Sequence, residues 1–170
     1  MTLLTVEDLN VKFDTDEGRI TAVENVSFEI NAGEVLGLVG ESGSGKTVTA
    51  KSLMQLYPSI AVYSSESGIH LDLESGVVEV LSLKSSRELE IVRGGAISMI
   101  FQEPMASFAP AITIGNQMVE QLLIHTSLSK RECSELSVEM LERVGIDAVS
   151  YTHLRAHETE ADLVCRLLLE

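Results

Sequence analysis

Apolar and polar residues alternate over much of the first thirty positions, which is the period-2 pattern of strands with one buried face. The expected strands cover residues 3–13, 20–23 and 26–30, with polar turns at 14–18 and 31–33. The run from Val35 to Val39 differs, because its apolar residues occupy both alternating faces. Such a run is typical of a strand buried on both sides within a helix-covered sheet.

The rest of the chain mixes helical and strand-like segments. Helices are expected from Lys46 to about Tyr57-Pro58 and over residues 86–92, 114–124 and 129–144. Strands are expected over 77–81 and 96–101. Residues 59–76 carry few strong signals. Ser85 or Ser86 is the expected cap of the second helix, and Ser129 caps the last one with Glu132 three residues on. Gly145 is expected to end that helix.

A complete phosphate-binding motif joins the apolar run to the first helix. Residues 40–47 have the sequence Gly-Glu-Ser-Gly-Ser-Gly-Lys-Thr, which matches G-x-x-x-x-G-K-[ST]. A strand before the motif and a helix after it are the context that the motif requires. A chance match in a chain of this length and average composition has a probability under about one per cent. The sequence therefore predicts nucleotide binding.

The residue types in this loop suit a chain of phosphates. Glycines allow backbone conformations in which successive N–H groups turn inward and form an anion-binding nest. Lys46 is expected to reach the β- and γ-phosphates, and the Thr47 hydroxyl is expected to ligate Mg²⁺. The predicted nucleotide-binding residues of this stretch are Gly40, Glu41, Ser42, Gly43, Ser44, Gly45, Lys46, Thr47 and Val48.

Composition narrows the range of functions. The 170 residues are 45% hydrophobic, which is enough for one domain with a real core. A formal net charge of −14 argues against nucleic acid as a partner. Neither a signal peptide nor a run of apolar residues that could span a membrane is expected. Cys133 and Cys165 lie far apart and are expected to be free thiols in a reducing compartment.

A second motif makes the interpretation more specific. Residues 97–104 have the sequence Ile-Ser-Met-Ile-Phe-Gln-Glu-Pro, so that an expected strand presents Gln102 at its exit. With this motif, the phosphate loop and the stretch from Arg93 to Met105, the chain resembles the ATP-binding subunits of ABC transporters. Within that family it is similar to the oligopeptide, dipeptide and nickel importer group, over about residues 2–148.

The resemblance implies an α/β fold: a P-loop NTPase core with an N-terminal antiparallel β subdomain and the start of a helical subdomain. It implies ATP and Mg²⁺ as cofactors, with Lys46 and Gln102 as catalytic residues and Thr47 and Gln102 at the metal. Phe13 is implied to stack on adenine, and the alternative is a core aromatic residue at a strand end. The implied partners are transmembrane permease subunits and a second ATP-binding subunit, at the cytoplasmic face of the cell inner membrane.

The later motifs of the family do not follow. Leu136-Ser137 is followed by Val138-Glu139 rather than by two glycines, and no apolar strand ending in Asp-Glu comes after residue 110. The expected organisation is a partial ATPase core with the β subdomain over 1–110, the start of the helical subdomain over 111–148, and a non-native tail over 149–170. That tail resembles a translated sequencing adapter. We therefore expect a truncated chain that binds nucleotide weakly and hydrolyses it negligibly.

Two other functions stay open at this point. A soluble P-loop NTPase or kinase unrelated to transport would need an Arg-containing lid, and the nearest basic cluster is Lys130-Arg131 on a helix cap. A non-transport ABC ATPase of translation or DNA repair is disfavoured by the acidic charge and by the Phe-Gln-Glu-Pro-Met sequence. The transported solute is not encoded in this chain, because the permease and a binding protein would determine it.

Overall fold

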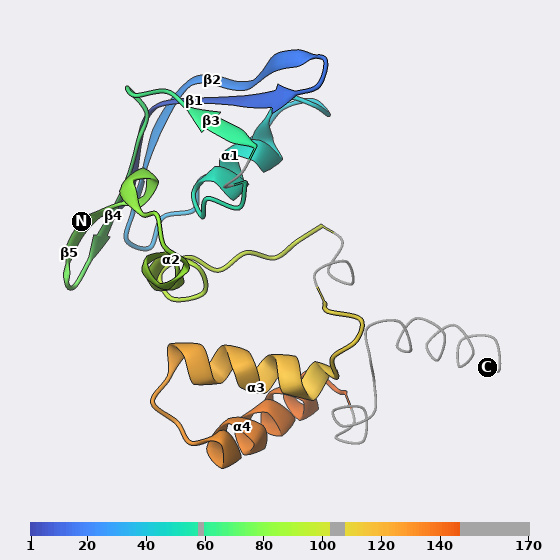
Figure 1. The fold of residues 1–170 in the computed structure, drawn as a ribbon. Helices are drawn as coiled ribbons and strands as arrows, with labels where there is room; N and C mark the ends of the chain where they lie inside the picture. The colour runs from blue at the N-terminus through green and yellow to red at the C-terminus, as the bar shows by residue number, and fades with distance from the viewer. Residues whose placement is uncertain (58–59, 103–107, 147–170) are drawn as a thin grey trace. The chain divides into compact units, whose positions relative to one another are not determined.

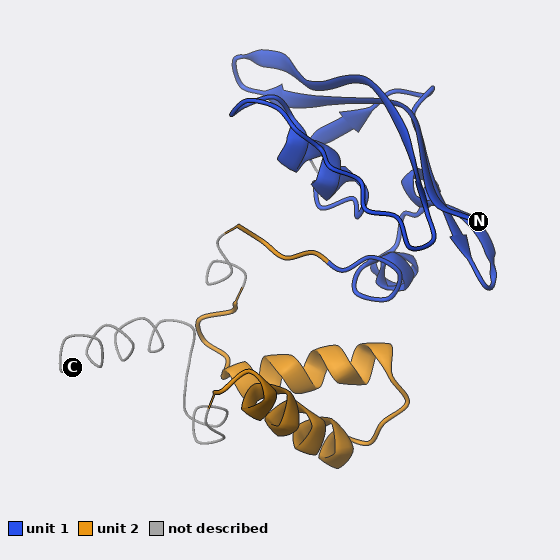
Figure 2. Cartoon of the chain, turned by 180° about the vertical axis from the view of Figure 1, so that it is seen from behind, with its two compact units in different colours: residues 1–98 blue, residues 99–170 orange. Residues whose placement is uncertain are grey.

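The computed structural model describes residues 1–57, 60–102 and 108–146. The chain divides into two compact units, residues 1–98 and residues 99–170 (Figure 2). The first unit holds an antiparallel sheet with short helices, and the described part of the second unit holds a helical hairpin (Figure 1). The α/β fold predicted from the sequence is confirmed. The predicted tail from residue 149 lies outside the described residues.

One long hairpin forms one side of the sheet, and its first strand lies in the interior of the sheet. The strands are β1 (Thr2–Thr15), β2 (Gly18–Asn31), β3 (Ala61–Tyr63), β4 (Gly68–Leu73) and β5 (Gly76–Glu79). β1 pairs with β2 along nearly its whole length, and its other edge pairs with β4 near its start and with β3 near its end. All pairs are antiparallel, and the order is β2-β1-β4-β5 with β3 beside β1.

A bulge in β1 changes which positions of the strand face the core. Asp8 has a left-handed φ of 43°, and the register with β2 shifts between Val6 and Leu9. Leu4 and Val6 are buried before the bulge, and Leu9 and Val11 are buried after it. The extra residue switches the alternation of side chains by one position. Leu4, Val6, Leu9 and Val11 therefore all lie on the core face, two on each side of the bulge.

The core of the first unit lies between the sheet and short helices. These are α1 (Lys46–Ser52), the 3-10 helix η1 (Val80–Ser82) and α2 (Ser86–Val92). The buried side chains of this core are Leu4, Val6, Leu9, Val11, Val23, Ile69, Leu71, Val80 and Val92. Burial of one such aliphatic side chain stabilises a fold by roughly 1.5–3 kcal/mol relative to its exposure. α1 contributes the partly buried Val48 to this cluster, which holds the helix against the sheet.

The second unit contains two capped helices, α3 (Ile114–His125) and α4 (Lys130–Arg143). Their contact is centred on Val119 and Cys133, both buried. The capping box of Ser129 with Glu132 and the end of α4 at Gly145, which has a left-handed φ of 79°, confirm the sequence prediction. Within the described ranges, no helix combines the length and the apolar character needed to cross a bilayer.

The capping box of α4 leads to a prediction. Ser129 Oγ accepts a bond from the Glu132 amide, and Glu132 Oε2 accepts from the Ser129 amide at 2.8 Å and from Ser129 Oγ at 2.6 Å. Ser129→Ala is expected to cost the second unit about 1 kcal/mol at neutral pH. Urea denaturation of the whole chain, followed by circular dichroism, measures this loss. Ser127→Ala, an exposed serine two residues earlier, is the control and should be near neutral.

The same box makes the effect depend on pH. Hydrogen bonds from Ser129 hold the pKa of Glu132 below its usual range. A carboxyl group whose pKa is lower in the folded than in the unfolded chain stabilises the fold at every pH above its unfolded pKa. This stabilisation is lost as the pH falls through the pKa of the folded chain. The difference between Ser129→Ala and the wild type should therefore shrink when the denaturation is repeated at about pH 3. An undiminished difference there would show that the carboxylate takes no part.

Two apolar runs that were predicted as buried strands do not form strands. Val35 to Val39 lies outside every strand, with Val35 95% and Val39 94% exposed. In the stretch 96–101 only an isolated bridge forms, between Arg93 and Ile97, and Ile100 is 98% exposed. A strand forms only where neighbouring strands satisfy its N–H and C=O groups. Neither run pairs with a further strand among the described residues, so both predictions were wrong here.

The end of α1 also differs from the prediction. The helix ends at Ser52 instead of continuing to Tyr57. The Leu56 amide donates to Lys51 O at 3.1 Å and the Gln55 amide to Ser52 O at 3.0 Å, which is the bond pattern of a Schellman motif. Gln55 takes the left-handed conformation with φ 47°, at a position where Gly or Asn is usual. The sequence therefore carried no ordinary stop signal.

Smaller differences concern the strands. The two short strands predicted over 20–23 and 26–30 are one strand, β2, and the strand predicted over 77–81 ends at Glu79 and continues as η1. β3 and β4 fall within residues 59–76, where the Ser- and Gly-rich composition hid them. β4 does alternate, with Ile69 and Leu71 buried against β1. Its pairing partner on the β1 side lies more than sixty residues away in sequence, which a local pattern does not reveal.

Candidate nucleotide-binding site

The predicted phosphate loop leads directly into α1 in the first unit. Gly43 and Gly45 have left-handed φ values of 82° and 87°, a conformation that side chains other than glycine rarely adopt. Gly45 is the N-cap of α1 and lies against β2, where a Cβ would come within 2.6 Å of the Ala22 carbonyl oxygen. Thr49 Oγ1 donates to Gly45 O at 3.1 Å from within the helix. The end of the loop thus lies directly against β2, and the Thr49 hydroxyl ties it to the first turn of α1.

The ammonium group of Lys46 lies at the centre of the loop. Its Nζ donates to Gly40 O at 2.6 Å, to Glu41 O at 2.7 Å and to Ser44 Oγ at 3.2 Å. A Cβ on Gly40 would come within 2.5 Å of Ser44 Oγ, so a larger residue there would displace this hydroxyl from its present position beside Lys46. The backbone of the loop therefore surrounds one cation. A bound phosphate group would replace the two carbonyl oxygens as the hydrogen-bond acceptor of Lys46.

The two residues after Lys46 occupy the first turn of α1. Thr47 is exposed, and its hydroxyl makes no hydrogen bond with any other described residue. The predicted role of this hydroxyl as an oxygen ligand for Mg²⁺ stays a prediction. Val48 instead packs partly buried against the core of the sheet. Its side chain therefore anchors the helix, and a contact of Val48 with a nucleotide would have to come from its backbone.

Phe13 contacts an aromatic residue that sequence reasoning missed. Its ring lies edge-on against Tyr57, with centroids 5.2 Å apart and an interplanar angle of 75°. Lys51 Nζ lies 5.4 Å from the centroid of the Tyr57 ring. The sequence assigned Tyr57 only to a helix end, and no spacing signal links it to Phe13. Phe13 is partly buried and packs on the core of the first unit, and the adenine contact stays a prediction.

Gln102, the other predicted catalytic residue, belongs to the second unit, whereas the phosphate loop belongs to the first. Its side chain is exposed. The predicted approach of Gln102 to the metal and the γ-phosphate therefore stays a prediction. The described residues contain no cluster of His, Cys, Asp and Glu side chains that could hold a metal without help from a ligand.

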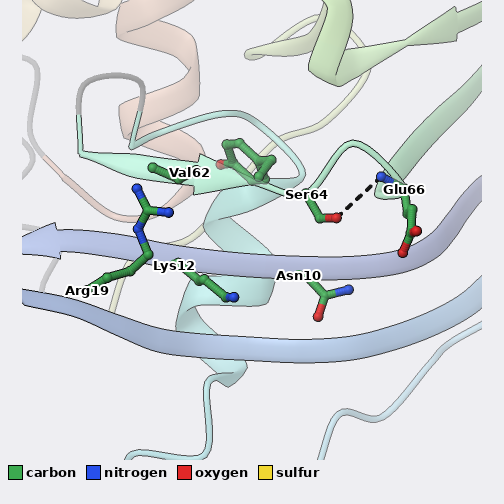
Figure 3. A pocket seen from close by; sticks show the side chains of 7 residues that line it. Asn10, Lys12, Arg19, Val62, Ser64 and Glu66 are labelled. Carbon is green, nitrogen blue, oxygen red and sulfur yellow. Dashed lines mark hydrogen bonds between the residues drawn. The ribbon is translucent and has the colours of Figure 1, made fainter.

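A separate hollow of about 300 Å³ lies along β1, β2 and β3 (Figure 3). It contains none of the loop residues, and Lys12, Arg19 and Glu66 are its charged lining residues. Arg19 is paired with Asp14, with Nε–Oδ1 at 2.6 Å and Nη2–Oδ2 at 3.1 Å. This pair lowers the pKa of Asp14, mainly through the hydrogen bond from Arg19. With Arg19 neutralised and Glu66 present, the hollow does not suit a triphosphate.

The second unit has an apolar hollow of its own, of about 580 Å³. Its lining includes Met99, Phe101, Met118, Leu122 and Met140. Met140 is 43% exposed, although methionine is an apolar residue. An apolar lining of this kind suits apolar side chains better than a charged nucleotide.

The fold and the loop together define a nucleotide-binding protein of the P-loop class. The chain belongs to the ABC transporter family, because residues 23–161 match that family. The match confirms the resemblance seen in the sequence and decides against an unrelated P-loop kinase. It also implies ATP as the nucleotide. The matched range extends into the segment predicted as a foreign tail, whose origin stays a prediction.

Proteins named as import ATP-binding proteins are similar to this chain. The oligopeptide transport ATP-binding protein OppD of Salmonella typhimurium is 40% identical over 168 residues, which is 98% of this chain and 48% of that protein. OppD of Escherichia coli is 39% identical over the same coverage. The glutathione import ATP-binding protein GsiA of Shigella boydii is 41% identical over 144 residues, 85% of this chain and 23% of GsiA. The chain thus spans less than half of these relatives.

Proposed function

We propose that the chain is part of the ATP-binding, energy-coupling subunit of an ABC importer for peptides or related solutes. The observation that carries the proposal is the loop closed around Lys46, in a chain that belongs to the ABC transporter family. The names of the relatives support the class of solute, because they refer to oligopeptides and glutathione. The particular solute would be determined by other subunits.

Each predicted site residue has a proposed role. Gly40 to Thr47 wrap the phosphates with their N–H groups, and Val48 keeps α1 in place beneath them. Lys46 neutralises charge on the β- and γ-phosphates, while Thr47 and Gln102 ligate Mg²⁺. Phe13 stacks on adenine while its ring keeps the edge-on contact with Tyr57. In phosphoryl transfer such groups act by positioning and by neutralising charge rather than by forming bonds with the phosphate.

The proposed partners are transmembrane permease subunits and a second ATP-binding subunit, at the cytoplasmic face of the inner membrane. The apolar hollow beside α3 and α4 supports a protein partner for the helical unit, because its lining includes the flexible side chains of Met99, Met118 and Met140, a residue type that adapts to varied protein contacts. The formal charge of −14 supports the absence of nucleic acid from this list.

Nucleotide binding by the chain tests the proposal. MgATP is expected to bind weakly, and Lys46→Ala is expected to weaken binding by about tenfold or more, because a charge-assisted hydrogen bond to phosphate is lost. Lys46 is the only Lys or Arg between residues 34 and 50. Isothermal titration calorimetry measures the affinity. Lys12→Ala, which removes an exposed lysine from the hollow of Figure 3, is the matched control and should leave the affinity unchanged.

Two results would contradict the proposal. One is a wild-type chain that binds no MgATP although circular dichroism shows that it is folded. The other is an equal affinity of the wild type and Lys46→Ala.

A further inference from the structure

Gln55 is held in a strained conformation at the end of α1. Its φ of 47° lies in the left-handed region, which residues with a Cβ rarely occupy. It is also 9% exposed, so a polar side chain is buried at this point. A residue of this kind persists only when its surroundings over-determine its position, and such residues gather at functional positions. The contacts of Gln55 therefore indicate what the end of α1 is attached to.

Two segments distant in sequence hold Gln55. Its Nε2 donates to the Val80 carbonyl of η1 and, at 3.4 Å, to the Leu83 carbonyl. Its own carbonyl accepts from Arg93 Nη2 at 2.6 Å, and Arg93 Nε donates to the neighbouring Met54 O at 2.9 Å. The planar fork of a guanidinium can bond two successive carbonyls at once, which the single ammonium of lysine does less well. We call Arg93, Met54 and Gln55 the arginine bracket.

Arg93 also begins a tight turn in the first unit. The Ile97 amide donates to Val92 O and the Gly94 amide to Ile97 O, both at 2.9 Å. Gly95 packs so closely that a Cβ would come within 2.6 Å of the Ile91 carbonyl oxygen. The turn is thus held by its own hydrogen bonds and, through Arg93, by the end of α1. The chain continues from this turn to Gln102, five residues after Ile97.

We infer that Arg93 is a positioning residue that ties the segment leading to Gln102 to the end of α1. The other end of α1 is the phosphate loop, so a nucleotide that orders the loop and α1 would also order the turn at residues 91–97. The inference rests on the proposed function, because it assigns the coupling to nucleotide binding. Its physical basis is one helix with the loop at its start and the arginine bracket at its end.

Hydrogen exchange of the full chain, with and without MgATP, tests the inference. Without nucleotide, Arg93→Gln is expected to speed exchange about threefold or more at both 53–57 and 91–97, since both sides of the bracket lose a partner. With MgATP, the wild type should gain protection over 46–54 and over 91–97. Arg93→Gln should keep the gain over 46–54 and lose it over 91–97. Arg93→Lys, which keeps the charge and can hold one carbonyl, should be intermediate.

Arg87→Gln is the matched control, because Arg87 is exposed on α2 and makes no hydrogen bond or ion pair with a described residue. It should behave as the wild type in every measurement. The inference is overturned if Arg93→Gln changes exchange at 91–97 but not at 53–57, or if MgATP protects 91–97 equally in Arg93→Gln and the control. If MgATP changes hydrogen exchange nowhere in the wild type, the proposed function is contradicted instead. The comparison of Arg93→Gln with the wild type in the absence of nucleotide then still tests whether the arginine bracket joins the two segments.

Discussion

Gly45→Ala is expected to destabilise the first unit by about 2–5 kcal/mol and to abolish MgATP binding. A left-handed φ of 87° costs a residue with a Cβ roughly 1–2 kcal/mol. The added methyl group would also lie 2.6 Å from the Ala22 carbonyl oxygen of β2. That oxygen belongs to the backbone of β2, which is paired with β1 along nearly its whole length, so it cannot move aside as the end of a flexible side chain could. Relief of the contact must instead shift the loop and α1.

Urea denaturation and calorimetric titration of the whole chain measure the two effects. Gly43→Ala is the matched control, because Gly43 has a similar φ of 82° but no atom near the position of an added Cβ. This variant should lose only the conformational part, roughly 1–2 kcal/mol. Equal losses in the two variants would show that contact with β2 does not determine the position of the loop.

Leu9→Ala is expected to cost about 2–5 kcal/mol, which is a large share of the stability of a unit of this size. Leu9 is fully buried, directly after the bulge at Asp8, and packs within the cluster that joins β1 to β2 and β4. Its removal leaves a cavity in the centre of the sheet, and the bulge limits how far β1 can move to fill it.

The comparison is with Leu3→Ala in the same strand. Leu3 is 40% exposed, and Leu3→Ala should lower the free energy of unfolding by less than about 1 kcal/mol. The reason is that truncation of a partly exposed side chain removes little buried surface. Denaturation midpoints at equal chain concentration measure the difference. Similar losses of stability for Leu9→Ala and Leu3→Ala would contradict the described burial of β1, in which Leu9 faces the core and Leu3 does not. A β1 without the bulge would not place Leu9 on the core face with Leu4 and Val6.

Local signals predicted the elements that depend on neighbouring residues. α2 covers 86–92 and α4 begins after Ser129, both as expected, because a capping box satisfies helix N–H groups within four residues. The phosphate loop was equally local, since its glycines, Lys46 and Thr47 lie within eight positions. These features need no distant partner, and the sequence was therefore enough to predict them.

The predicted site is less local, and less of it follows from the sequence. Phe13 was identified at a strand end, but its contact with Tyr57 joins residues 44 positions apart (57 − 13). The arginine bracket joins Arg93 to Met54 and Gln55, and neither Arg93 nor Gln55 carries a pattern that predicts the pairing. Gln102 was predicted from its motif alone.

The sequence by itself determined the family, the phosphate loop and the capped helices, because each depends on residue types at short, fixed spacing. The tertiary structure decided which apolar runs become strands. Val35 to Val39 has the composition of a buried strand, yet it stays exposed and outside the sheet, while the weakly signalled β4 pairs with β1. The reason is physical: a strand is completed by hydrogen bonds to another segment, and composition does not supply that segment.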